Sequence, residues 1–259
     1  RCHATAGRAM TVGALSRPTG AQATRPGIVA TLPAEARALA RLRLRGRALL
    51  GSGGQVALSG LGAARAEATA RMLVAEGANG LISWGSAAGL MPVLAPGDLL
   101  LPHQVRAANG DYYACDRDWL TTIAHAGDGL RIRHGLLAEA PGALTDTAAK
   151  QRLQQTSGAL AADMESAAVA RVAADFDLPF IAIRAVADDA TLILPPVIHA
   201  ALDVDGRLRP VPMLRALAGR PRSVHAQLRA LKQLAVAFRA AQDTLAQVAP
   251  VLRGDTAAN

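Results

Sequence analysis

The sequence predicts an α/β fold in which a sheet is covered by helices on both faces, and three observations predict it. Short β-branched or apolar runs alternate with Ala-rich segments of helical periodicity along most of the chain, as in α/β sandwiches. The run at 179–186 is almost continuously apolar, which is typical of a buried strand. Apolar residues make up 51% of the 259 residues, which is ample for a core, and we see no linker between two cores. We therefore expect one domain over 27–250.

The first half of the chain alternates strands with helices. Pro33 and Glu35 fit the first turn of a helix, where proline and acidic side chains are favoured. A glycine turn at 60–62 separates a strand from an Ala-rich helix. The expected elements are strands at 27–31, 55–59 and 80–84, and helices at 33–43 and from the glycine turn to about residue 76.

The second half continues the alternation and ends in helix. Residues 98–106 and 134–139 are candidate strands, and 111–113 reads as a loop. We expect a helix over 163–175, the buried strand at 179–186, and a helical segment over about 207–249 whose 225–247 part is amphipathic. That amphipathic face favours packing on the core over contact with a membrane.

The termini and the overall composition exclude several classes of protein. Residues 1–26 lack sustained periodicity and the apolar segment of a secretory signal, so we expect a disordered tail. No run approaches the ~18–20 apolar residues of a membrane span. Aromatic residues are only 3%, too few for stacking platforms on single-stranded nucleic acid. The two cysteines form no zinc pattern, so we expect no metal, no cofactor and a reducing, cytoplasmic location.

The net charge of +8 resembles a nucleic-acid signature, but its distribution argues otherwise. Lys150 and Lys232 are the only lysines, and the arginines are scattered. Together with the abundance of alanine, this pattern favours codon bias over a phosphate-binding face. We expect no specific nucleic-acid partner.

Two turns of small residues have different implications. The turn at 60–62 lacks the third glycine of a dinucleotide fingerprint, because Arg65 stands at that position; a tight strand–helix turn is the simpler interpretation. The turn at 85–89 follows a strand at the end where α/β sheets bind ligands. Its small residues would let a substrate approach the backbone, and Ser86 offers a hydroxyl, although a purely structural turn also fits.

Acidic side chains gather at three predicted strand–helix junctions. Glu35 follows the first strand, Asp188 ends the apolar strand, and Asp163 and Glu165 stand at the start of a helix. Asp163 fits a helix cap, whereas Glu165 can project into a cleft. Carboxylates in these places suggest general acid and base catalysis beside a polyol.

These residues resemble motifs of the nucleoside phosphorylase superfamily, most closely the methylthioadenosine/S-adenosylhomocysteine nucleosidases. The resemblance covers about 27–195 and implies a three-layer αβα sandwich with a central mixed sheet, and a homo-oligomer, usually a dimer. Segments near the end are similar to the branch associated with hopanoid biosynthesis, whose members are thought to remove adenine from adenosylhopane. The motifs that carry the resemblance are Gly27-Ile28-Val29 with Glu35, Ser59-Gly60-Leu61-Gly62, Gly85-Ser86-Ala87-Ala88-Gly89-Leu90, Gly97-Asp98, Asp163-Met164-Glu165-Ser166-Ala167-Ala168, Arg184-Ala185-Val186-Ala187-Asp188, and, for the hopanoid branch, Leu194-Pro195-Pro196, Asp205-Gly206-Arg207 and Gly219-Arg220-Pro221.

The resemblance implies a role for each candidate residue in cleaving the N-glycosidic bond of an adenine nucleoside. Asp188 would protonate N7 of the leaving adenine, and Glu35 would be the general base for an attacking water. Glu165 would accept hydrogen bonds from the ribose hydroxyls, with Met164 packed on the sugar. Ser86, with backbone N–H groups of the turns at Gly85 and Gly62, would help to hold the nucleophile.

Two departures from the family pattern bear on the choice of nucleophile. Ala187 stands before Asp188 where the nucleosidases usually have a serine, so the hydrogen bond that would orient the carboxylate is lost. Ser83 stands where phosphorolytic relatives carry an arginine, and without that cation water is favoured over phosphate. The hopanoid branch is nevertheless usually described as phosphorylases, so phosphorolysis stays an alternative, as does a non-catalytic nucleoside-binding module.

Overall fold

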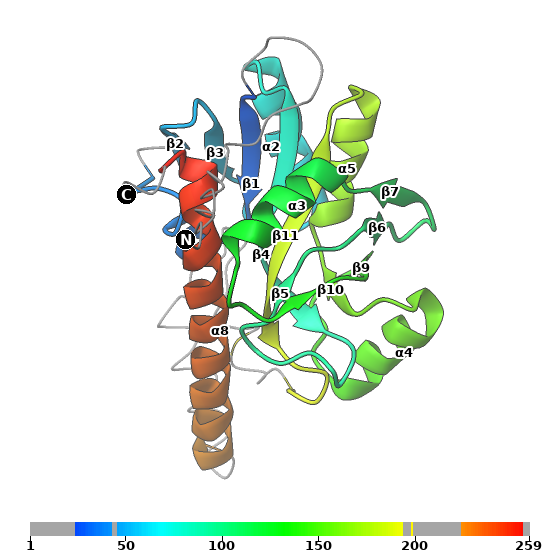
Figure 1. The fold of residues 1–259 in the computed structure, drawn as a ribbon. Coiled ribbons are helices and arrows are strands. Elements are labelled where there is room, and N and C mark those ends of the chain that lie inside the picture. The colour runs from blue at the N-terminus through cyan, green and yellow to red at the C-terminus, as the bar shows by residue number, and fades with distance from the viewer. Residues whose placement is uncertain (1–23, 43–45, 194–197, 199–223, 256–259) are drawn as a thin grey trace, which may run out of the picture.

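The computed structural model describes residues 24–42, 46–193, 198 and 224–255, and its described strands form one mixed sheet (Figure 1). The sheet runs in the order β2-β3-β1-β4-β10-β9-β6-β7, and a branch from β4 leads through β11 and β5 to β8. The strands are β1 (Pro26–Ala30), β2 (Arg47–Leu49), β3 (Gln55–Leu58), β4 (Gly80–Gly89), β5 (Leu99–Leu100), β6 (Gln104–Arg106), β7 (Tyr112–Ala114), β8 (Ile132–Arg133), β9 (Leu136–Glu139), β10 (Ala161–Asp163) and β11 (Phe180–Asp188).

β4 is the strand from which the sheet branches. It pairs in parallel with β1 and with β11, and its last two residues pair antiparallel with β10. Because β1, β4 and β11 run in the same direction, their carboxyl ends lie at one edge of the sheet. Parallel sheets place their ligands at this edge.

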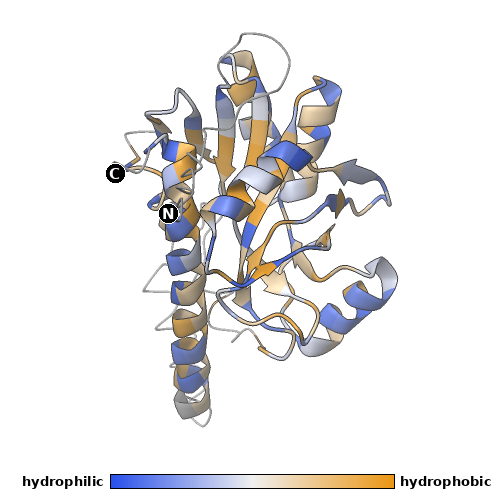
Figure 2. Cartoon of the chain, in the orientation of Figure 1, coloured by the Kyte–Doolittle hydropathy of each residue, from blue (hydrophilic) through white to orange (hydrophobic). Residues whose placement is uncertain are grey.

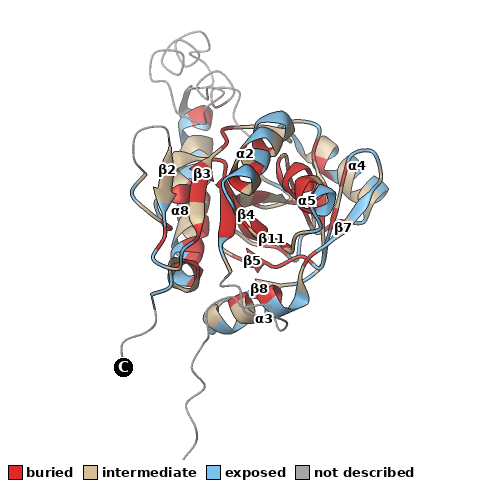
Figure 3. Cartoon of the chain, turned by 90° about the horizontal axis from the view of Figure 1, so that it is seen from above, coloured by how far each residue is buried: buried red, intermediate tan, exposed pale blue. Residues whose placement is uncertain are grey.

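The helices cover both faces of the sheet, as Figure 3 shows from above. α2 (Ala63–Ala75) and α5 (Ser166–Asp175) pack together on one face. On the other face α8 (Val224–Arg253) packs on β11 and contacts α1 (Pro33–Ala36) and α3 (Arg117–Ala126). A further helix, α4 (Thr147–Ser157), follows β9 (Figure 1). The predicted α/β class, with a central mixed sheet and flanking helices, is confirmed.

The core is built mainly from alanine, leucine, valine and isoleucine, as a chain with few aromatic residues requires. Every residue of β11 is buried, and seven of the ten residues of α5 are buried. Figure 2 shows hydrophobic residues concentrated on the central strands. Trp84 and Trp119 are the largest fully buried side chains among the described residues. Small alanine side chains let α5 pack closely on the sheet.

The last helix, α8, uses its apolar face inside the protein. Leu245, Val248 and Leu252 are almost fully buried, and the helix packs against β11, as the amphipathic pattern predicts. No helix in the described part of the chain is long and apolar enough to cross a membrane. The predicted helical residues 207–223 lie outside the described residues, as do the motifs at 194–196, 205–207 and 219–221.

The structure corrects several predicted elements. The helix expected over 33–43 ends at Ala36, because the chain turns there and buries Leu39 in the hydrophobic core. The turn expected at 85–89 is the second half of β4, where pairing with β10 and β11 outweighs the low strand preference of small residues. The helix expected from residue 163 begins at Ser166, since 161–163 pair with β9.

Further differences concern short strands and two helices. The single strand expected over 98–106 is two strands, β5 and β6, and the loop expected at 111–113 overlaps β7, which pairs with β6. The predictions also missed β2, β8, α3 and α4. Strands of two or three residues are too short for a periodic pattern, so only their pairing partners define them.

Candidate functional site

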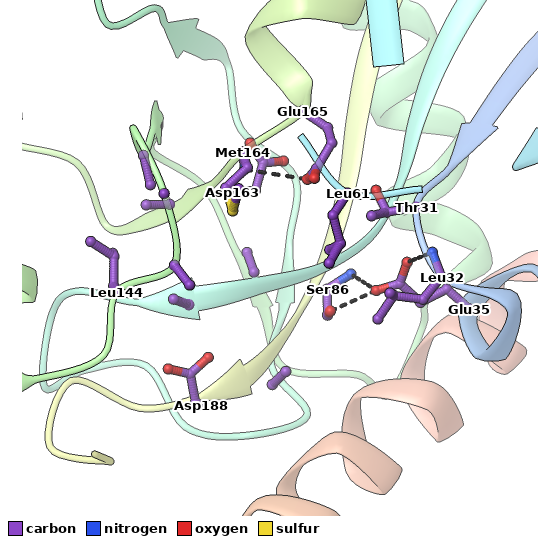
Figure 4. A pocket seen from close by; sticks show the side chains of 17 residues that line it. Thr31, Leu32, Glu35, Leu61, Ser86, Leu144, Asp163, Met164, Glu165 and Asp188 are labelled. Atoms are coloured by element: carbon purple, nitrogen blue, oxygen red, sulfur yellow. Dashed lines mark hydrogen bonds between the residues drawn. The ribbon is translucent and has the colours of Figure 1, made fainter. Parts of the chain in front are cut away.

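A pocket of about 160 Å³ opens at the carboxyl ends of β1, β4, β10 and β11. Five of the predicted site residues line it: Glu35, Ser86, Met164, Glu165 and Asp188. Figure 4 shows Glu35 and Ser86 close together, Met164 and Glu165 on another side of the pocket, and Asp188 apart from both. The small residues of β4 and of the segment after β9 leave the pocket open between them, at Ala87, Ala88, Ala140, Gly142 and Ala143.

Glu35 is held in place by three hydrogen bonds. Its Oε1 accepts from the Ser86 backbone N–H at 2.9 Å and from Ser86 Oγ at 2.6 Å, and its Oε2 accepts from the Leu32 N–H at 3.0 Å. Burial raises the pKa of Glu35 above its usual range, while the Ser86 hydroxyl and the Arg184 guanidinium oppose that rise. A buried carboxylate with a raised pKa is suited to accept a proton near neutral pH.

Gly85 makes the position of Glu35 possible. A Cβ at residue 85 would lie 2.6 Å from Glu35 Oε2 and 2.7 Å from Arg184 Nη1. The glycine is therefore required by close approach to both groups. Gly85 does not line the pocket, and it acts by leaving room for Glu35.

Glu165 lies at the start of α5 and faces the turn before α2. Its Oε1 accepts the backbone N–H of Gly62 at 2.8 Å. Gly62 has a φ of 99°, a conformation that favours glycine. Burial first, and then the neighbouring carboxylate of Asp163, raise the pKa of Glu165 to about 7, whereas Arg184 acts in the opposite direction. Gly62 thus orients Glu165 from outside the pocket.

Asp188, at the end of β11, forms an ion pair with a side chain that the sequence analysis missed. Lys150 of α4 donates to Asp188 Oδ2, and neither residue is well exposed: the lysine side chain is 0% and the aspartate side chain 11% accessible. Burial raises the pKa of Asp188, Lys150 opposes that rise, and Asp189 adds to it. Ala187 contributes no side-chain hydrogen bond.

A second buried cation, Arg184 of β11, contacts Asp163, which lines the pocket. Its Nε pairs with Asp163 Oδ2 at 2.6 Å, and its Nη2 donates to Ser166 Oγ at 2.9 Å and to Ser83 Oγ. Asp163 also accepts the Ser166 N–H at 3.1 Å, near the start of α5. The sequence analysis assigned Arg184 no role, and it took Ser83 to mark a missing cation. The guanidinium of Arg184 in fact contacts Ser83.

The missed residues left weak signals in the sequence. Arg184 is the one charged residue in the apolar run at 179–186, and Lys150 is one of two lysines in a chain rich in arginine.

Thr31 also lines the pocket, and its buried Oγ1 has no hydrogen-bond partner among the described residues. A buried hydroxyl without a partner is costly, so this oxygen is placed to bind a polar group in the pocket.

The site carries no metal-binding cluster within the described ranges. Its polar groups are carboxylates, hydroxyls and two buried cations that are already paired with carboxylates. Such a set can donate a proton, accept a proton and hold hydroxyl groups.

Comparisons with known proteins find a related sequence and similar folds. The 5′-methylthioadenosine/S-adenosylhomocysteine nucleosidase of Tolumonas auensis is 29% identical over 167 residues, which is 56% of this chain and 73% of that protein. The crystal structure of the enzyme of the same name from Neisseria meningitidis, in complex with methylthio-immucillin-A, matches with a TM-score of 0.65 at 17% identity, over 89% of this chain and 99% of that chain. Futalosine hydrolase of Helicobacter pylori matches with a TM-score of 0.62 at 16% identity, over 87% and 97% of the two chains.

The family comparison covers most of the chain and every candidate residue of the pocket. Residues 27–199 match the model of the phosphorylase superfamily. That range runs from β1 to beyond Asp188, and it includes both buried cations, Lys150 and Arg184. The chain therefore belongs to the phosphorylase superfamily and is an enzyme of its nucleosidase or phosphorylase type.

Proposed function

We propose that the protein hydrolyses the N-glycosidic bond of an adenine nucleoside. The observation that carries this proposal is a single pocket in which a buried carboxylate held by Ser86, Glu35, lies apart from a second buried carboxylate, Asp188. Cleavage of this bond places positive charge on the ribose and negative charge on the purine. An acid on the base side and a general base on the sugar side match those two needs, as in inverting glycoside hydrolysis.

Each polar group has a task in this reaction. Asp188 gives its proton to N7 of the departing adenine, so that the base leaves as a neutral molecule. Glu165 accepts hydrogen bonds from the ribose hydroxyls, and Met164 packs on the sugar. Glu35 takes a proton from the water that attacks the anomeric carbon, while Ser86 and Thr31 offer hydroxyl groups to hold the reacting oxygen atoms.

The surroundings of Glu35 favour water over phosphate as the nucleophile. A carboxylate beside the attacking group would repel a phosphate anion, by roughly 4 kcal/mol at 4 Å with an effective dielectric constant of ~20. The nearby guanidinium of Arg184 is already paired with Asp163. Phosphorolysis remains the alternative that the experiment separates from hydrolysis.

The test is release of free adenine from a panel of nucleosides. Purified protein is incubated with methylthioadenosine, S-adenosylhomocysteine, adenosine and adenosylhopane, with and without phosphate, and the sugar product is identified by mass. We expect adenine and free sugar without a requirement for phosphate, and the best substrate defines the 5′ group; preference for adenosylhopane would place the protein in hopanoid synthesis. A ribose 1-phosphate product would establish phosphorolysis instead, and binding without turnover would contradict an enzymatic role.

A further inference from the structure

The helix α4 buries one side chain, and that side chain is a lysine. Lys150 is 0% exposed, whereas the rest of α4 is intermediate or exposed, and Figure 2 shows the helix as largely hydrophilic. Burial of an ammonium group is unfavourable unless charge pairing and hydrogen bonds compensate it. Lys150 therefore needs partners that account for its burial.

Those partners all belong to the end of β11 and the residues that follow it. Nζ donates to the Asp188 carboxylate, to the Asp189 carbonyl oxygen and to the Leu192 carbonyl oxygen at 3.2 Å. An ammonium group has three N–H donors, so these contacts use all of them. The Asp189 carboxylate in turn accepts the backbone N–H groups of Thr191 and Leu192, which folds this segment around the lysine.

Asp188 depends on this contact. Among the described residues, Lys150 is the hydrogen-bond partner of the Asp188 carboxylate, and Ala187 has no polar side chain to take its place. The pairing occupies Oδ2 and leaves Oδ1 for a ligand in the pocket. The charged groups close to Asp188 are the ammonium of Lys150 and the carboxylate of Asp189, which act on it in opposite directions.

We propose that Lys150 is a positioning residue that orients Asp188 and strengthens it as a proton donor; this inference rests on the proposed function. When Asp188 passes its proton to N7 of the purine, the C–N bond breaks, its electron pair goes to the base, and the carboxylate that forms is neutralised by the adjacent ammonium. After the base leaves, water returns a proton to Asp188. Without Lys150 the acid would hold its proton more tightly and would lack a fixed orientation.

The test compares Lys150→Met, which keeps an unbranched chain without charge, with Lys232→Met on the exposed surface of α8 as the matched control. Turnover of the best nucleoside from the panel is measured against pH. We expect Lys150→Met to lower kcat about 10–100-fold with little change in KM. The alkaline limb of the profile should move to higher pH, because the pKa of Asp188 is no longer held down. Lys232→Met should behave as the wild type, and Lys150→Arg, which retains the charge, should keep the alkaline limb in place.

Two further measurements separate this role from a merely structural one. In an Asp188→Asn background, Lys150→Met should cause no further loss of turnover, because both changes disable the same proton donor. An aryl riboside whose phenolate leaves without protonation should be cleaved by Lys150→Met almost as well as by the wild type.

Several results would overturn the inference. One is an unchanged kcat in Lys150→Met. Another is a double variant in which the losses of the two single variants add. A third is a loss of turnover with the aryl riboside as large as the loss with the adenine nucleoside. Circular dichroism shows whether Lys150→Met folds. If it does not fold, the pH profile of Lys150→Arg is the test. An alkaline limb of that profile that shifts from its wild-type position, although the charge is retained, contradicts the proposal. Failure of the proposed function is seen separately, as a wild type that releases no base from any nucleoside.

Discussion

At the scale of single residues, four carboxylic acids line the pocket, and the three to which we assign a role in the reaction have different surroundings. Asp188 faces an ammonium, Glu35 accepts three hydrogen bonds, and Glu165 lies near another carboxylate and accepts the backbone N–H groups of Gly62 and Met164. When the surroundings of neighbouring acids give them different affinities for a proton, one acid can donate a proton while another accepts one. Two substitutions test the two assignments.

Asp188→Asn should lower the turnover of adenine nucleosides by about 10²-fold or more. The amide has nearly the same shape, and its oxygen can still accept from Lys150, but it has no acidic proton to give to N7. Adenine release is measured together with thermal unfolding. Asp128→Asn, at an exposed position after α3, is the control. Turnover of Asp188→Asn within twofold of the wild type would mean that the acid lies elsewhere.

Glu35→Gln should lower turnover by orders of magnitude at every phosphate concentration, because a water nucleophile needs a base as the bond forms. Turnover is followed across a phosphate titration, and the sugar product is identified by mass. Glu76→Gln, at a partly exposed ion pair with Arg47, is the control. Phosphate-dependent turnover that survives Glu35→Gln would exclude the hydrolytic mechanism and leave nucleoside cleavage standing.

At the scale of elements, β4 joins the parts of the site. It lies between β1, which leads to Glu35, and β11, which ends at Asp188, and it carries Ser86 itself. At residue 85 its backbone comes close to Glu35 and Arg184. A side chain at this position would push apart groups that the reaction needs together.

Gly85→Ala should therefore reduce both turnover and stability, by about 1–3 kcal/mol in the free energy of unfolding, as overpacking of a well-packed interior does. The substitution is followed by urea unfolding and by adenine release. Gly127→Ala is the control, because Gly127 has a negative φ and its added Cβ would meet side-chain ends at 3.4 Å. Wild-type activity in Gly85→Ala would show that the close approach of Glu35 is not required.

At the scale of the whole molecule, the active-site acids couple stability to pH. Burial raises the pKa of Glu35, Glu165 and Asp188 above their usual values, so the folded protein binds protons at these groups more tightly than the unfolded chain. A raised carboxyl pKa contributes stability that is fully present below the unfolded value and is lost as the pH rises through the folded value. For Glu165 this window runs from 4.5 to about 7.

Glu165→Gln should flatten the loss of stability between pH 4.5 and about 7. The wild-type contribution of this group is on the order of 3 kcal/mol at acidic pH, and the amide removes the titration. The free energy of unfolding is measured in urea across this range. Glu67→Gln should leave the decline in place, because the pKa of Glu67 is lowered by Arg171 and Arg71. If the free energy of unfolding of Glu165→Gln declines with pH as steeply as that of the wild type, the decline arises from other groups.

Much of this protein follows from local pattern. The α/β class, the strands at 55–58 and 180–188, and the pocket residues Glu35, Ser86 and Glu165 could be predicted, because strand periodicity and polar residues at strand ends are properties of short segments. The limits of α1 and the length of β4 could not be predicted in this way. Both depend on what the segment packs or pairs against rather than on its own residues.

The sequence by itself therefore determined which side chains lie at the carboxyl edge of the sheet, since the strands and the residues that follow each of them can be identified from the sequence. Only the tertiary structure decided how those side chains are paired. Lys150 reaches Asp188 across 38 positions, and Arg184 reaches Ser83 across 101. Such pairs leave no periodic signal, because they form only when the fold brings distant segments together and buries polar groups that must then be paired.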